Sequence, residues 1–466
     1  MSIIRKNNWR DVTGNRGDLI WYGLAITDEE LELSAKKIVN RIPGMDYISR
    51  KRPLGEILKM IYRYYPEHFS IFPRTFLLPD DKEELENAMQ VKKKYFIVKP
   101  TCGSQGDGIY IINNPKELEN TRMHNWCDVV IQEYLHPPML LMQKKFDLRL
   151  YVLVTSVNPL CAYLNTEGLA RFCTENYEAP TNQNINNHFM HLTNYSLNKL
   201  SSKFVHTDEL IESNDGSKQT LTSLYSQLSS SGYPVDQIQS NIKELIAKTL
   251  IAVQAGLSHQ FDSRLKAAKL NKVRCFHILG IDVLLTEDCR AWLLEINANP
   301  SLRVDFETEI SPGVMQSIPS ALDLHVKTQV VEDAVLISQM KKKQQIALDR
   351  FNSYERVLPN DYGFNECAVT MMDLQKVFSM FTDIKNPFAI PSGKFRRVCM
   401  KIKGVLMREM ISADYDIIYL RAVKKFEIPQ MDFFAFISAI EEIARRYLDG
   451  NLIENVLRLI NTLKSN

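Results

Sequence analysis

Two apolar, β-branched segments in the second half of the chain are separated by a short polar stretch. The apolar segments are 277–285 and 291–296, and the polar stretch is 286–290. This pattern predicts a β-hairpin. In an antiparallel hairpin, residues at equal distances from the centre of the turn face each other, so we expect Asp282 opposite Glu295. Strand alternation places Asn297 on the same side as Glu295.

The oxygen-bearing side chains of this hairpin predict a metal site. Hard Mg²⁺ binds through one or two carboxylates and leaves its other positions to water and substrate phosphates. Asp282 could instead be a polar interruption and Glu295 a charge at a strand end. A carboxylate inside the apolar run 292–296 needs a partner, however, which favours a cation. The predicted Mg²⁺ ligands are Asp282, Glu295 and Asn297.

A second pattern of apolar residues lies earlier in the chain. Residues 95–100 and 109–112 read as strands, and residues 101–108 between them include three glycines. Glycines let backbone N–H groups approach phosphate oxygens, and Lys99 at the strand end can meet phosphate charge. Because no GKS or GKT sequence of a Walker loop follows, this segment alone leaves nucleotide binding and an ordinary hairpin loop equally open.

Two further strand patterns lie between these segments. Residues 129–135 form an apolar run that ends in polar groups, and such a strand can lie along an adenine. In 145–154, Lys145, Asp147 and Arg149 share one face before the run becomes wholly apolar. Three charges on one face indicate a polar cleft, whereas a single charged pair would favour a salt-bridged strand edge.

Two other segments have apolar residues at helical spacing. Residues 238–253 predict a core helix that ends near Gly256. Near the C-terminus, apolar residues from Val398 to Leu406 keep helical spacing, which predicts a basic amphipathic helix. Its cations are Lys394, Arg396, Arg397, Lys401, Lys403 and Arg408. A solvated helix face and electrostatic docking on an acidic partner both remain open.

Composition bounds the class of protein. The chain has 466 residues, a net charge of +2, 45% hydrophobic and 24% charged residues, so it can bury more than one core. Its eight cysteines include no CxxC pair, which favours reduced thiols over zinc. The N-terminus lacks a signal-peptide pattern and no segment reads as a membrane span, so we expect a cytoplasmic protein with no membrane partner. The short run 341–343 indicates a solvated linker or a helix end, and we expect no nucleic-acid partner.

Eight motifs occur in an order that resembles the tubulin-tyrosine-ligase-like family. They are YFIVKP, QGDG, KFDLRLYVLVTS, EGLARF, HLTNYS, GSK, GIDVLL and LLEINANPS, and the resemblance covers about residues 9–335. It implies an α/β (α+β) fold with an ATP-grasp core. The expected parts are an N-terminal α/β lobe at 1–85, a central ATP-grasp lobe at 86–145, a C-terminal ATP-grasp lobe with the metal site at 146–340, and a basic helical extension at 341–466, a candidate microtubule-binding region.

The resemblance also implies roles for individual residues. Those expected around ATP are Lys99, Gln105, Gly106, Gln132, Glu133, Tyr134, Leu135, Lys145, Phe146, Asp147, Thr193 and Asn194. Those expected to hold a free amino acid are Arg171, Tyr195, Ser196, Lys218 and Lys327. Lys99 and Arg149 are expected to act in catalysis through positioning and charge neutralisation. For Arg171 a structural ion pair, and for Lys327 a solvated position, remain open.

Two or three cations at the amino-acid site suit a ligand with two carboxylates, because glycine or tyrosine would leave one of those charges unpaired. Glutamate is therefore the expected substrate. EGLARF and NANPSLRVDFETEISPGV are most similar to tubulin polyglutamylases, particularly the kind that elongates side chains.

The resemblance implies an ATP- and Mg²⁺-dependent activity on the acidic tails of tubulin. A glutamate carboxylate of the tail would attack the γ-phosphate, and the amino group of free glutamate would displace phosphate from the acyl phosphate. The expected location is the cytoplasm and cytoskeleton, including the cilium and basal body. The alternatives are a ligase that adds glutamate or glycine to another acidic protein, and a non-catalytic microtubule-binding protein.

Overall fold

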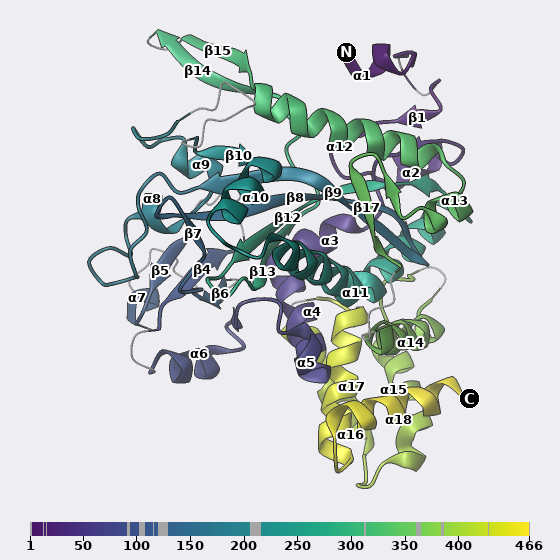
Figure 1. Cartoon of the computed structure of the whole chain (residues 1–466). Helices are drawn as coiled ribbons and strands as arrows, with labels where there is room; N and C mark the ends of the chain where they lie inside the picture. Colours follow the sequence, from purple (N-terminus) through teal and green to yellow (C-terminus); the bar gives the residue numbers. More distant parts are fainter. Residues whose placement is uncertain are drawn as a thin grey trace.

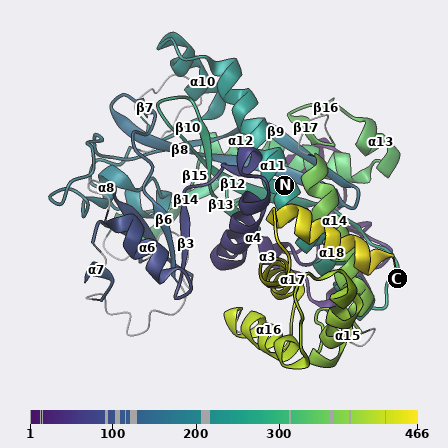
Figure 2. The same ribbon diagram turned by 90° about the horizontal axis from the view of Figure 1, so that it is seen from below.

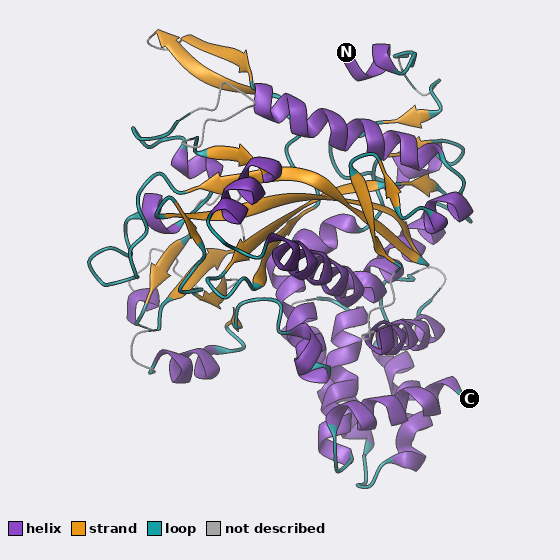
Figure 3. Cartoon of the chain, in the orientation of Figure 1, coloured by secondary structure: helices purple, strands orange, loops and turns teal. Residues whose placement is uncertain are grey.

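The computed structural model describes the chain except for residues 1, 13, 15, 91–93, 102–107, 115, 120–128, 206–215, 312–313, 360–364, 384–385, 427 and 466. It is a mixed α/β structure with several sheets, as expected from the sequence. Figures 1 and 3 show a long central sheet with helices on both sides, a smaller sheet at one end, and a group of helices at the C-terminus. No described helix is long and apolar enough to cross a membrane.

The central sheet has eight strands in the order β13-β12-β8-β9-β17-β16, with β10 beside β9 and β7 beside β8. The strands are β7 (Leu140–Leu141), β8 (Lys144–Val157), β9 (Leu160–Phe172), β10 (Lys218–Thr220), β12 (His277–Leu285), β13 (Ala291–Asn297), β16 (Arg350–Phe351) and β17 (Tyr354–Leu358). Their pairings are antiparallel. The sheet therefore continues beyond residue 340, where the helical extension is predicted to start.

Successive side chains of β8 point to opposite faces of the sheet and contribute to two separate hydrophobic cores. Leu148 and Leu150 join the hydrophobic cluster that contains α11 (Val235–Ala267), whereas Tyr151 and Leu153 join the cluster that contains α12 (Ala321–Gln339). Figure 1 shows these two helices on opposite sides of the sheet. The odd-numbered charged residues of β8 therefore lie on the α12 side.

A four-stranded antiparallel sheet contains the predicted strand–loop–strand segment. Its order is β3-β6-β4-β5, with β3 (Thr75–Leu78), β4 (Phe96–Pro100), β5 (Tyr110–Ile112) and β6 (Val129–Glu133). β4 and β5 pair through Phe96 and Ile112, which confirms the two strands. The helix α6 (Lys82–Met89) covers this sheet with a hydrophobic cluster of its own. Gln105 and Gly106 of the loop lie outside the described residues.

The remaining elements surround these two sheets. A three-stranded parallel sheet joins β1 (Leu19–Ile20), β2 (Ile38–Val39) and β11 (Arg274–Cys275), and β14 (Asp305–Ser311) pairs with β15 (Val314–Pro319). The shorter helices are α1 (Ser2–Lys6), α2 (Asp28–Leu33), α3 (Met45–Ser49), α4 (Lys51–Tyr64), α5 (Pro66–Phe69), α7 (Lys116–Glu119), α8 (His188–His191), α9 (Tyr195–Asn198), α10 (Leu221–Ser230) and α13 (Lys342–Ala347).

The C-terminal helices pack against the central core. They are α14 (Asn365–Phe381), α15 (Ser392–Ile402), α16 (Ser412–Lys425), α17 (Phe433–Tyr447) and α18 (Leu452–Lys464). Seen from below, they lie on one side of the molecule and α6 with the small sheet on the other (Figure 2). Their apolar side chains join the cluster of α11. Arg63 of α4 also pairs with Glu441 of α17 at 2.8 Å.

The predicted basic helix is shorter than the run of basic residues that predicted it. α15 ends at Ile402, a 3₁₀ turn covers Lys403–Val405, and Arg408 lies beyond both. Lys394 pairs with Asp383, Arg396 with Asp416 and Arg408 with Asp449. These acids come from other parts of the chain, so local positive charge is lower than the sequence run suggested. Microtubule docking by this helix stays a prediction.

The prediction that the core helix ends at Gly256 is wrong. α11 continues to Ala267, and a Cβ atom on Gly256 would lie 2.5 Å from the ring of Phe434 in α17. That ring is held in place because it stacks on Tyr47 at 5.3 Å between centroids. Gly256 therefore gives room to a packing partner from the C-terminal helices.

We expect Gly256→Ala to destabilise the protein by about 1–3 kcal/mol, because overpacking forces a held side chain to move. Urea unfolding would measure the change. Gly393→Ala in α15 is the matched control: a Cβ there meets nothing within 4 Å, so helix propensity alone should make it neutral or slightly stabilising. Equal effects of the two substitutions would contradict the packing role of Gly256.

Candidate functional site

The hairpin predicted for the metal site is present. Asp282 of β12 pairs in register with Glu295 of β13, as expected from the sequence. The amide of Asn297 donates a hydrogen bond to a carboxylate oxygen of Glu295 at 3.1 Å. The structure thus brings the three predicted ligands together at one end of the hairpin.

Charged side chains continue from this hairpin across the sheet. Asp282 is the register partner of Arg149 on β8, and two residues earlier Asp147 is the partner of Arg171 on β9. Arg171 is in turn opposite Lys218 on β10. Because register partners and residues two apart share a face, these groups form one charged row across five strands, on the α12 side.

Buried ion pairs hold the row together. Arg149 binds Asp282 with two hydrogen bonds of 2.5 and 2.9 Å, and Arg171 binds Asp147 at 2.7 and 2.6 Å and Asp282 at 2.8 Å. Burial by itself would raise the pKa of Asp282, but the two guanidinium groups hold it well below its usual range. Thr193 also donates to Asp147 at 2.7 Å.

Arg171 is therefore a structural ion-pairing residue, as the sequence left open. Its side chain is 12% exposed, and those of both aspartates are 4% exposed. Binding of a substrate carboxylate by Arg171 stays a prediction beside this structural role.

The donor set at the end of the hairpin fits Mg²⁺. Burial and the neighbouring Asp282 carboxylate raise the pKa of Glu295, so a cation placed beside Glu295 would favour its charged form. With the Asn297 amide they offer only oxygen ligands. Within the described parts of the chain, no group of three or more His, Cys, Asp and Glu could hold a metal.

The two halves of the predicted ATP site meet at one cavity. Lys99 and Gln132 of the small sheet line it together with Glu295 of the central sheet, and residues of α4 close one side. Lys99 donates to Gln132 at 2.6 Å, and Gln132 donates to Thr75 at 3.0 Å. Thr75 is a site neighbour that sequence patterns missed, since only the pairing of β3 with β6 brings it here.

Lys145 lies deeper than Lys99 and has polar but uncharged partners. It donates to the hydroxyl of Tyr134 at 3.0 Å and to the backbone carbonyl of His191 at 2.9 Å. Burial lowers the pKa of Lys99 and of Lys145 to about 8 each. In the described part of the chain, neither ammonium forms an ion pair with a carboxylate. Two such cations favour an anionic ligand such as a phosphate.

We expect nucleotide affinity to fall as the pH rises above about 8. Both lysines are charged below this pKa and lose charge above it, while bound phosphate would favour the charged form. Calorimetric titration of ATP between pH 6.5 and 9.5 would measure the change. Lys145→Met should weaken binding and flatten the pH dependence. Affinity that is constant across this range would contradict the assignment.

The amino-acid site predicted around Lys218 contains an acid that the sequence reading missed. Asp323 of α12 pairs with Lys218 and with Lys327, the latter at 2.9 Å. Lys327 also donates to the backbone carbonyl of Arg303 at 2.6 Å, so the solvated position considered for it is wrong. The ring of Tyr195 lies 4.9 Å from the Lys218 ammonium. The i,i+4 spacing of Asp323 and Lys327 was the available signal.

The structure also places the remaining residues that were predicted to bind ATP or the amino acid. Asn194 directly precedes α9, which carries Tyr195 and Ser196, and Leu135 lies two residues after the end of β6. Glu133 pairs with Lys94 at 2.6 Å. Phe146 is buried against Phe172 in the core with α11, on the face opposite Asp147. The structure therefore does not bring Phe146 to the charged face, and its ATP contact remains only a prediction.

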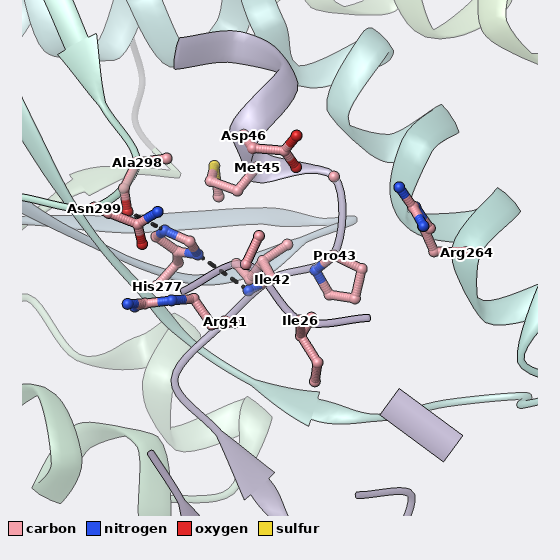
Figure 4. A pocket seen from close by; sticks show the side chains of 12 residues that line it. Ile26, Arg41, Ile42, Pro43, Met45, Asp46, Arg264, His277, Ala298 and Asn299 are labelled. Carbon is pink, nitrogen blue, oxygen red and sulfur yellow. Dashed lines mark hydrogen bonds between the residues drawn. The ribbon is translucent and has the colours of Figure 1, made fainter. Parts of the chain in front are cut away.

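A second cavity of about 80 Å³ is lined by His277 of β12 and by Ala298, the residue after β13 (Figure 4). Within it, His277 accepts a hydrogen bond from the backbone N–H of Ile42 at 3.1 Å and donates to the carbonyl of Ala298 at 2.6 Å. Arg41 donates to three backbone carbonyls. Since Ala298 follows Asn297 directly, the two hydrogen bonds of His277 connect the end of β13 to the N-terminal part of the chain.

Comparison with known proteins gives one family. The profile described as the Tubulin-tyrosine ligase family matches residues 29–346. The chain is 40% identical to tubulin polyglutamylase TTLL11 of Mus musculus over 355 residues, which cover 74% of this chain and 48% of that protein. It is 36% identical to tubulin polyglutamylase TTLL6 of Mus musculus over 321 residues, covering 68% and 36%.

A third relative matches more of the chain. Tubulin polyglutamylase ttll-11 of Caenorhabditis elegans is 28% identical over 483 residues, covering 95% of this chain and 67% of that protein. The match therefore takes in most of the C-terminal helices as well. The chain spans about half the length of the mouse and human TTLL11 proteins.

Proposed function

The chain belongs to the tubulin-tyrosine ligase family, and on this basis we propose that it is an ATP- and Mg²⁺-dependent ligase that adds glutamate to glutamate side chains of tubulin tails. Family membership confirms the resemblance found in the motifs, and it implies the ATP-grasp fold and the use of ATP. The similar proteins carry the name tubulin polyglutamylase, which supports this substrate. We place the protein in the cytoplasm and cytoskeleton, including the cilium.

The observation that carries the proposal is the meeting of Lys99 and Glu295 at one cavity. Lys99 and Lys145 would hold ATP phosphates, and Asp282, Glu295 and Asn297 would hold Mg²⁺, which neutralises phosphate charge during transfer. The tail carboxylate would take the γ-phosphoryl group as ADP leaves. The amine of free glutamate would then form the amide bond and release phosphate.

The charges near the amino-acid site support glutamate over glycine. Among the described residues, these ion pairs join the four cations Arg149, Arg171, Lys218 and Lys327 to the three carboxylates Asp147, Asp282 and Asp323, so the seven groups carry a net charge of +1. Free glutamate carries one net negative charge at neutral pH, and glycine carries none. The net charge of glutamate balances the net positive charge of these groups, which favours glutamate because an unpaired buried charge is costly.

Incubation of the purified chain with microtubules, ATP, Mg²⁺ and labelled amino acid would test this function. We expect label from glutamate, but not from glycine, in the tail peptides of tubulin, with mass increments of whole glutamate residues. Omission of ATP or Mg²⁺ should abolish labelling. Label from glycine would favour the other ligase activity, and microtubule binding without ATP turnover would favour a non-catalytic protein.

The mapped peptide would also separate elongation from initiation. Because EGLARF resembles the elongating kind, we expect faster labelling of tubulin that already carries glutamate chains. Tubulin without such chains is the matched comparison substrate. Preference for the unmodified tubulin would overturn the elongating assignment while leaving the ligase assignment in place.

A further inference from the structure

Asp323 is a buried acid placed between the two lysines of the amino-acid site. One of its carboxylate oxygens pairs with Lys218 of β10, and the other lies 2.9 Å from the ammonium of Lys327. The side chains of Asp323, Lys327 and Lys218 are 6%, 8% and 16% exposed. A single carboxylate thus holds two cations that come from different elements.

The local structure fixes Asp323 from both sides. It occupies the first turn of α12, where its backbone N–H donates to the side chain of Ser320, the N-cap residue, at 3.2 Å. Lys327 follows one helical turn later and is also held by the carbonyl of Arg303. The ring of Tyr195 contacts Lys218. The positions of both ammonium groups are therefore set before any ligand arrives.

The carboxylate of Asp323 remains charged in this place. Burial by itself would raise its pKa, but Lys218 and Lys327 lower it more, so that the net pKa lies below its usual range. Without this charge two buried ammonium groups would repel each other. With it, the net charge of the three groups is +1.

Resting on the function proposed above, we propose that Asp323 is a positioning residue that sets the selectivity for an amino acid with a side-chain carboxylate. It holds the ammonium groups of Lys218 and Lys327 as a fixed pair. It also reduces the net charge of the three groups to +1, which one ligand carboxylate would balance. The role is exerted through the two lysines, because the acid itself would repel the substrate.

Kinetics of Asp323→Asn would test this inference. We expect the KM for free glutamate to rise about tenfold, since the two lysines lose their common anchor, while the KM for ATP changes less than twofold and kcat less than threefold. Selectivity for glutamate over glutamine should fall by a similar factor. Asp323→Glu retains the charge and should recover part of the loss.

Glu332→Gln is the matched control, because Glu332 is also a buried acid of α12 that pairs with a lysine, Lys6, at 2.9 Å. It should leave both KM values unchanged. A parallel rise of the KM for glutamate and for ATP in Asp323→Asn would indicate general structural damage and overturn the inference. Unchanged KM for glutamate would overturn it as well.

A second measurement does not need activity. Labelling of amines in the ligand-free protein, read by peptide mass spectrometry, should modify Lys218 and Lys327 several-fold faster in Asp323→Asn than in the wild type. Equal labelling would refute the anchoring role even where wild-type turnover is absent, which separates it from failure of the proposed function. If Asp323→Asn does not fold, Asp323→Glu replaces it, with an intermediate rate expected and a wild-type rate refuting the inference.

Discussion

Glu295→Gln is expected to lower ATP-dependent glutamate incorporation by about 100-fold or more, the usual scale for loss of a charge-stabilising group in a dry site. Glu295 faces Asp282 at the cavity that also contains Lys99, and glutamine there cannot supply a second carboxylate to a dication. Initial rates of label transfer over a Mg²⁺ titration would measure the loss.

The fold should survive this substitution. Glutamine keeps the shape of Glu295 and can still accept the hydrogen bond from Asn297. It also removes a carboxylate whose pKa is raised by burial and by repulsion from Asp282. The melting temperature of the ligand-free variant should therefore be no lower than that of the wild type. Turnover that recovers fully at saturating Mg²⁺ would remove Glu295 from the metal site.

The parts of the site that the sequence predicted are those set by local geometry. One hairpin contains Asp282 and Glu295, so its two strands and its turn could be predicted from alternation. The exact pairing also depends on a β-bulge: Val283 faces Leu293 next to the turn, and a register shift between Val283 and Asp282 brings Asp282 opposite Glu295. The same holds for Lys99 at the end of β4, in a segment whose two strands pair with each other.

The parts that the sequence missed depend on pairing between distant segments. Arg149 and Arg171 meet Asp282 only because β12, β8 and β9 lie side by side, and no local pattern encodes that order. Counting cations alone therefore overstated the positive charge of the amino-acid site. Gly256 was misread for a similar reason, since the ring that needs its space comes from Phe434.

These buried pairs mean that function and stability cannot be separated by sequence reasoning alone. A cation predicted to hold substrate can already be paired with carboxylates in the ligand-free protein, as Arg171 is. The distinction can be measured, because the loss of a structural cation lowers stability without any ligand, whereas the loss of a purely substrate-binding cation does not.

Arg171→Ala is accordingly expected to destabilise the ligand-free protein by about 3–5 kcal/mol, the scale for breaking a buried ion pair. Asp147 and Asp282 would both lose a guanidinium partner in a place where their side chains are 4% exposed. Urea unfolding without nucleotide or amino acid would measure the loss. Arg303→Ala is the matched control, because the Arg303 side chain is 57% exposed and its pairs with Asp305 and Glu307 are screened by water, so it should change stability little.

A second substitution would locate the cause of this loss. In the Arg171→Ala background, Asp147→Asn removes the carboxylate that has lost its guanidinium partner, so it should recover part of the stability, whereas Asp282 keeps its two bonds from Arg149. In the wild-type background the same change breaks the pair and should destabilise. This reversal of sign is expected only if the ion pair itself stabilises the row. Full stability of Arg171→Ala, with only a higher KM for glutamate, would instead make Arg171 a substrate-binding residue without a structural role.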